Sequence, residues 1–164
     1  LVNSGINVGI GTDTVPPDII NEMRTTSLLS KIKDDDPTSG NSRQVYNAAT
    51  LGGAKALNRK DLGRLDKGCR ADILIINISN LRTGLVDDPI KALVYYSCSN
   101  DIKTVIINGT IVLDDYNIIG LDEGKLYNDA QNLFNKIRMK YLVNPKKHFN
   151  AKSTDNNTFK IIKN

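Results

Sequence analysis

Two β-branched runs on either side of Asn108-Gly109 restrict the fold of this chain more than any other feature of its sequence. The runs cover residues 103–107 and 110–113. Asn-Gly readily adopts the positive φ angles that both central residues of a type I′ turn require, and this turn joins antiparallel strands. The sequence therefore predicts a β-hairpin here, and the apolar run over residues 71–77 predicts a further strand.

The beginning of the chain has a different pattern, typical of one strand followed by one helix. Residues 6–10 form a short apolar run that predicts a buried strand, and polar residues arrive only at its end, in Gly11-Thr12-Asp13-Thr14. Pro16 and Pro17 then favour a helix start. Apolar residues recur at helical spacing up to the acidic loop at 34–36, so we expect one βα unit.

Three more helices are predicted downstream: one from Ser42 as N-cap, a short one after Asp88-Pro89, and a long one over about residues 122–142. The first has an inner face of small residues: Val45, Ala48, Ala49, Gly52 and Ala56. The adjacent Gly52 and Gly53 each cost a helix about 1 kcal/mol relative to Ala. We therefore expect another backbone to pack closely against this face.

Composition excludes several classes of protein. The 164 residues suffice for one domain of ordinary size, and no run reaches the ~18 to 20 apolar residues of a membrane-spanning helix. The first residues do not resemble a signal peptide. Cys69 and Cys98 have no CxxC spacing, so we expect free, buried thiols, a reducing compartment and a cytoplasmic location.

The basic end of the chain raises the question of a nucleic-acid partner. Residues 136–164 carry eight Lys or Arg residues against one acid, within a net charge of +4 for the whole chain. No aromatic stacking platform accompanies these charges, so we interpret them as a solvated helix and tail and expect no nucleic acid or membrane as partner. Nucleic-acid binding would instead show an affinity that collapses with salt.

Asp13 is the strongest candidate for chemistry. A carboxylate at the C-terminal tip of a buried strand lies where α/β barrels place their catalytic groups, and there it can bind a metal or accept a proton from a metal-bound water. The alternative is a carboxylate that caps a nearby turn. Glu22 and Arg24 are interpreted as surface-helix residues, and the acidic loop lacks the oxygen spacing of an EF-hand.

The chain lacks a complete catalytic set of its own. His148 is the only histidine, and catalytic zinc sites usually take three protein ligands. Neither a glycine-rich phosphate loop nor a GxSxG motif is present. A Cys–His nucleophile pair would form only if the fold happened to bring His148 next to a cysteine.

Several motifs follow one another along residues 1 to about 143. They are Gly11-Thr12-Asp13-Thr14, Glu22-Met23-Arg24, residues 49–57, Asp61-Leu62-Gly63-Arg64-Leu65 with Gly68, residues 71–73, Asp88-Pro89 and residues 105–109. In this order they resemble the C-terminal part of the amidohydrolase superfamily, in its chlorohydrolase and aminohydrolase group. This group includes S-adenosylhomocysteine, guanine and cytosine deaminases.

The resemblance implies an α/β fold: the last βα unit of a metal-dependent TIM barrel, the C-terminal part of a small β-sandwich, and a closing helix. Residues 1–60 would hold the final barrel strand and helices, residues 61–120 the sandwich part, residues 121–143 the closing helix, and residues 144–164 a polar basic tail. A TIM barrel needs ~250 residues, so the chain resembles a fragment. An unpartnered barrel strand exposes its edges, so we expect residues 1–60 to contact another chain, the rest of the barrel, or to rearrange.

The resemblance further implies a hydrolase of non-peptide carbon–nitrogen bonds that deaminates a nitrogen heterocycle by means of a metal-activated water. Asp13 would bind the metal, zinc or alternatively iron, and take the proton, while Thr14 is a candidate for lining the substrate pocket. The other metal ligands would lie upstream, so the chain alone is expected to be inactive. The alternative is a non-catalytic β-sandwich assembly module derived from such an enzyme.

Overall fold

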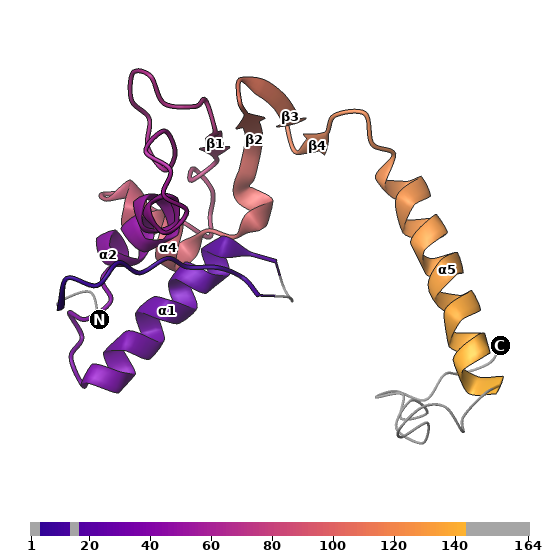
Figure 1. Cartoon of the computed structure of the whole chain (residues 1–164), viewed down its shortest axis with the longest axis horizontal. Helices are drawn as coiled ribbons and strands as arrows, with labels where there is room; N and C mark the ends of the chain where they lie inside the picture. The colour runs from indigo at the N-terminus through magenta and orange to yellow at the C-terminus, as the bar shows by residue number, and fades with distance from the viewer. Residues whose placement is uncertain (1–3, 14–16, 144–164) are drawn as a thin grey trace. The chain divides into compact units, whose positions relative to one another are not determined.

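The computed structural model describes residues 4–13 and 17–143, with the side chains of 141–143 left out (Figure 1). The chain divides into two compact units, residues 1–119 and 120–164. The first unit contains helices around a small core together with an antiparallel sheet, and the second contains one long helix. The fold is thus mixed α/β, as expected.

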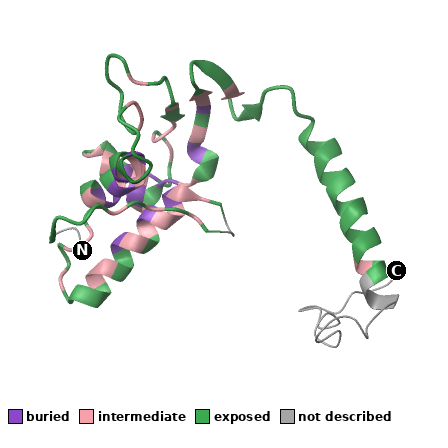
Figure 2. Cartoon of the chain, in the orientation of Figure 1, coloured by how far each residue is buried: buried purple, intermediate pink, exposed green. Residues whose placement is uncertain are grey.

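The core of the first unit lies between three helices. Helix α1 covers Ile19–Asp34, α2 covers Ser42–Asn47 and α4 covers Pro89–Tyr96. Ile20, Met23, Val45 and Val94 form the buried apolar cluster, in the purple region of Figure 2. The predicted helices after Pro17 and after Asp88 are confirmed, and Asp18 and Asp88 cap them through their side chains.

The helix predicted from Ser42 is present but interrupted. Its N-cap is Asn41 rather than Ser42, because Asn41 and Gln44 form a reciprocal capping box. After α2 the chain continues as a π-helical segment, η2 (Ala48–Gly52), and then as α3 (Gly53–Ala56). The wider π turn shifts the inner face, so Ala54 is buried and Ala56, predicted inside, is exposed.

Four antiparallel strands form one sheet in the order β1-β2-β3-β4. Their bounds are Ile73–Ile76, Ile102–Ile107, Thr110–Asp114 and Asn117–Ile118. The predicted hairpin is confirmed: Ile107 pairs with Thr110, and φ is +50° at Asn108 and +81° at Gly109. The strand predicted at 71–77 is confirmed over its central four residues, whereas β4 was not predicted.

The predicted buried strand at residues 6–10 is wrong. This segment has no regular secondary structure, and Ile6 is 54% exposed. A parallel strand requires neighbouring strands for its ladder, and within the described residues none pairs with it. The segment instead lies against η2, where Ile10 N donates to Ala48 O at 3.3 Å.

The second unit contains α5, which covers Glu123–Val143 and confirms the predicted long helix to within a residue at each end. The expected apolar stripe is exposed at Leu126, Leu133, Phe134 and Ile137. The basic tail at 144–164 lies outside the described residues. Among the helices of the described part, none is long and apolar enough to cross a membrane.

Candidate functional site

Asp13 ends the irregular segment that begins the described chain. Its side chain is exposed, and its backbone has φ +54°, in the left-handed region. Asp adopts this region more readily than most residues, because its short polar side chain can hydrogen-bond locally. The carboxylate is therefore accessible to a ligand, although it does not lie at the end of a strand as predicted. Thr14 lies outside the described residues.

The segment before Asp13 is fixed against the π-helical turn. Asn7 Nδ2 donates to Gly52 O at 3.0 Å, and Ile10 N donates to Ala48 O. The predicted close approach of a backbone to the small-residue face is confirmed, because an added Cβ on Gly52 would lie 2.1 Å from Val8 O. Two hydrogen bonds and one tight backbone contact therefore hold the chain shortly before Asp13.

The chain after Asp13 is fixed at Asp18. Asp18 Oδ1 accepts from the amides of Ile20 and Asn21, and Oδ2 accepts from Ser99 Oγ at 2.7 Å. Partial burial raises the pKa of this carboxyl, but the hydrogen bonds from Ser99 and from backbone amides outweigh it and hold the pKa below 3.8. Asp13 thus lies between two anchored points of the same unit.

Arg24 links two helices, which its interpretation as a surface-helix residue missed. Its Nε donates to Val94 O at 3.0 Å, and its NH2 group donates to Ser97 O. These carbonyls belong to the C-terminal end of α4, which would otherwise leave acceptors unpaired. The partners lie 70 and 73 positions away, so no local signal could have revealed them. Glu22 is half-buried in α1.

The remaining candidates do not gather around Asp13. Cys69 and Cys98 are free, as predicted, but they are partly exposed rather than buried. The acidic residues 34–36 lie at the end of α1, with Asp34 as its last residue, and Asp36 accepts from Thr38 in the turn that follows. His148 lies outside the described residues. No three His, Cys, Asp or Glu side chains come together within residues 4–13 and 17–143.

A metal ion therefore finds one carboxylate at Asp13 and not a complete ligand set in the described part of the chain. Catalytic zinc sites use three protein ligands and keep one position open. Asp13 fits as one oxygen ligand of such a site. The described residues do not hold a zinc ion by themselves.

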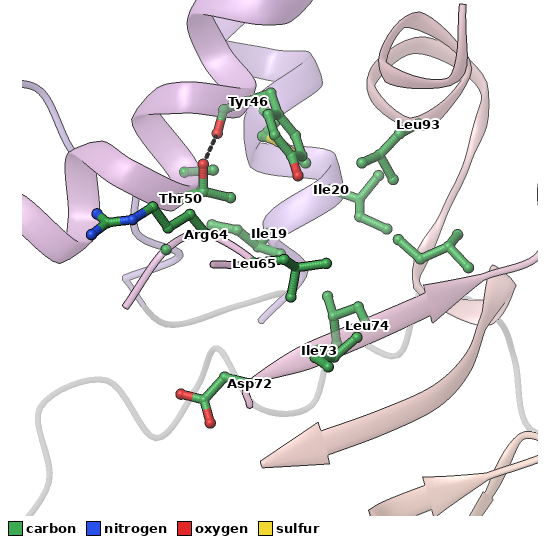
Figure 3. A pocket seen from close by; sticks show the side chains of 14 residues that line it. Ile19, Ile20, Tyr46, Thr50, Arg64, Leu65, Asp72, Ile73, Leu74 and Leu93 are labelled. Atoms are coloured by element: carbon green, nitrogen blue, oxygen red, sulfur yellow. Dashed lines mark hydrogen bonds between the residues drawn. The ribbon is translucent and has the colours of Figure 1, made fainter. Parts of the chain in front are cut away.

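An apolar cavity of about 300 Å³ is lined in part by Ala49 and Thr50 of η2 (Figure 3). Aliphatic side chains from α1, α4 and β1 surround it, among them Ile19, Ile73 and Leu93. The charged ends of Arg64 and Asp72 point away from this cluster in Figure 3. The cavity therefore lacks convergent polar groups for catalysis and is not the candidate site.

The model of the Amidohydrolase family matches residues 1–112, more than half of the chain. The chain belongs to the amidohydrolase family. Among curated relatives, the 5'-deoxyadenosine deaminase of Methanosarcina barkeri is 36% identical over 135 residues, which are 80% of this chain and 31% of that protein. The 5-methylthioadenosine/S-adenosylhomocysteine deaminase of Pelotomaculum thermopropionicum is 38% identical over the same shares.

Solved structures lead to the same family. An adenosine deaminase from Xanthomonas campestris with bound zinc matches with a TM-score of 0.80 and 30% identity, over 85% of this chain and 33% of that one. The zinc-complexed atrazine chlorohydrolase of Arthrobacter aurescens matches with a TM-score of 0.73 and 25% identity, over 80% and 30%. This amidohydrolase chain thus spans about a third of the length of its relatives.

Proposed function

We propose that the chain is the C-terminal part of a metal-dependent hydrolase that deaminates a nitrogen heterocycle. In this proposal residues 1–60 complete a TIM barrel, residues 61–120 complete a β-sandwich, residues 121–143 form the closing helix and residues 144–164 the tail. The observation that carries the proposal is the exposed Asp13 carboxylate, held between two anchored points in a chain of the amidohydrolase family.

Asp13 has two roles in this proposal: it supplies one oxygen ligand to the metal, and it accepts a proton at a carboxylate oxygen. A bound divalent metal lowers the pKa of its water ligand to near 7 and so supplies a nucleophile at neutral pH. Zinc is favoured over iron because two similar solved structures contain zinc. The exposed position of Asp13 leaves its carboxylate free to serve both roles.

The substrate proposed is the amino-substituted purine of an adenosine-type nucleoside. The support is that the relatives include deaminases of 5'-deoxyadenosine and of 5-methylthioadenosine or S-adenosylhomocysteine. Thr14, which follows Asp13 in the sequence, is proposed to line the pocket. Hydrolytic loss of the amino group consumes one water molecule and releases one molecule of ammonia, so that the atoms balance.

The chain alone is proposed to be inactive and to contact the rest of the barrel or a second copy. Leu74 and Ile75, consecutive residues of β1 that point to opposite faces of the strand, are each 49% exposed. Both faces of β1 therefore carry apolar surface that another polypeptide segment can cover. The partner polypeptide would supply the missing ligands.

The test is a chimera in which this chain replaces the matching 31% of the Methanosarcina barkeri deaminase. We expect zinc in the purified chimera, turnover of 5'-deoxyadenosine, and a loss of about 10²- to 10⁴-fold in kcat with Asp13→Ala. Asp35→Ala is the matched control, since Asp35 is also exposed and has φ +50°. Unchanged zinc and turnover in Asp13→Ala would remove Asp13 from the mechanism and favour the non-catalytic module.

A further inference from the structure

The backbone of the π-helical turn η2 supports the segment that carries Asp13. A π turn closes i→i+5 hydrogen bonds and is found mostly as a single turn inside an α-helix, frequently at a functional site. Here the carbonyls at its two ends accept from outside the helix: Ala48 O from Ile10 N, and Gly52 O from Asn7 Nδ2. The irregular turn therefore provides one acceptor for the Ile10 amide and one for the Asn7 side chain.

Gly52 sets the distance between this turn and the segment. An added Cβ would lie 2.1 Å from Val8 O, whereas carbon–oxygen contacts normally lie near 3.3 Å. The segment would thus have to move by roughly 1 Å. Its neighbour Gly53 has nearly the same helical backbone, with φ −62° at both, yet an added Cβ there meets nothing within 4 Å.

The position of Asp13 depends on this contact because Asp13 lies five residues after Val8 in the same segment. Ile10, whose amide donates to Ala48 O, lies between them, three residues before Asp13. A shift of the backbone at Val8 therefore moves the Ile10 amide first and reaches Asp13 through residues 9–12.

We propose that Gly52 is a positioning residue for Asp13, and that the absence of a side chain at Gly52 fixes where the Asp13 carboxylate lies. The inference rests on the proposed function in giving Asp13 its role at the reacting centre. A misplacement of about 1 Å of a catalytic group costs about 10²-fold in rate. Gly52→Ala therefore acts on turnover without touching a substrate.

The first arm of the test uses the 164-residue chain as it is. Amide hydrogen exchange followed by NMR compares Gly52→Ala with Gly53→Ala, which gains the same methyl group and the same helix propensity. We expect the Ile10 amide to exchange about tenfold faster or more in Gly52→Ala and at the unaltered rate in Gly53→Ala, with the α1 amides unchanged in both. Equal exchange at Ile10 in the two variants overturns the proposal.

The second arm uses the chimera with the Methanosarcina barkeri deaminase. We expect Gly52→Ala to lower kcat about 10²-fold with KM nearly unchanged, and Gly53→Ala to leave both unchanged. A general loss of stability would instead lower the amount of folded enzyme and leave kcat per zinc-loaded enzyme unaltered, and that result overturns the positioning role. If Asp13→Ala has no effect, the proposed function fails, while the exchange at Ile10 still decides whether Gly52 seats the segment.

Discussion

Ser99 Oγ donates a 2.7 Å hydrogen bond to Asp18 Oδ2 and so joins two residues 81 positions apart. The other oxygen of the same carboxylate accepts from the amides of Ile20 and Asn21 and caps α1. One side chain thus caps the N-terminus of α1 and ties it to the 3-10 helix Ser99–Asp101 that follows α4. Asp18 stabilises the fold as an anion in both contacts.

Asp18→Ala should lower the free energy of unfolding by about 1 to 2 kcal/mol at pH 7, the cost of losing a helix cap. The pKa of Asp18 lies below 3.8 in the folded chain, so its contribution is present above pH 3.8 and is lost as pH falls through the folded pKa. Urea denaturation at a series of pH values from 7 downward measures this. A difference between the two proteins that stays constant down to pH 2 would contradict the prediction. Asp87→Ala, an exposed carboxylate before α4, is the control.

Arg24→Gln should destabilise the first unit by about 1.5 to 3 kcal/mol, the range for hydrogen bonds made by a charged group. The guanidinium serves Val94 O and Ser97 O together, and a lysine lacks this fork, so Arg24→Lys should recover only part of the loss. Urea denaturation compares both variants with Arg43→Gln, which alters an exposed arginine on α2. Equal free energies of unfolding for Arg24→Gln and Arg43→Gln would show that the hydrogen bonds from Arg24 to the end of α4 do not stabilise the first unit.

Local signals predicted most of the elements. The Asn108-Gly109 turn, the helix starts after Pro17 and after Asp88, and the long α5 helix all depend on residues that are close together in the sequence. The two residues of β4 are too few to show an alternating hydrophobic pattern, and the π turn at Ala48–Gly52 is too short to show a periodicity. Neither element could therefore be predicted.

The environment of the candidate site was less accessible from the sequence. The small-residue face predicted a close backbone contact but not its partner, Val8. The apolar run at 6–10 predicted a strand because such a run forms a buried strand when parallel strands lie beside it. The described residues contain no parallel strand next to this run. The hydrogen bonds of Arg24 to Val94 and of Ser99 to Asp18 span 70 and 81 positions, beyond the reach of spacing arguments.

The Arg59–Asp61 pair predicts a measurable titration. The side-chain hydrogen bonds from Arg59, at 2.8 and 2.7 Å, lower the pKa of Asp61 to about 2 and outweigh desolvation, which raises it. Arg59→Gln should therefore return the pKa of Asp61 toward 3.8, as followed by carbon NMR of its carboxyl group. Lys60→Gln, next to it in sequence, should leave the pKa near 2. A normal pKa of Asp61 in the unaltered chain would contradict the bidentate pair.

Gly109→Ala should lower the free energy of unfolding by about 1 to 2 kcal/mol, the cost of a left-handed backbone at a residue with a Cβ. Gly109 has φ +81° and open space around it, so the backbone conformation and not a clash causes the loss. Gly53→Ala is the matched control: its site is also open but helical, so it should stabilise by up to about 1 kcal/mol. Urea denaturation of the two variants should therefore give changes of opposite sign. Gly109 N also donates to Ala71 O and so links the turn to the residues before β1. A change of the same sign in both variants would mean that the type I′ turn does not constrain the hairpin.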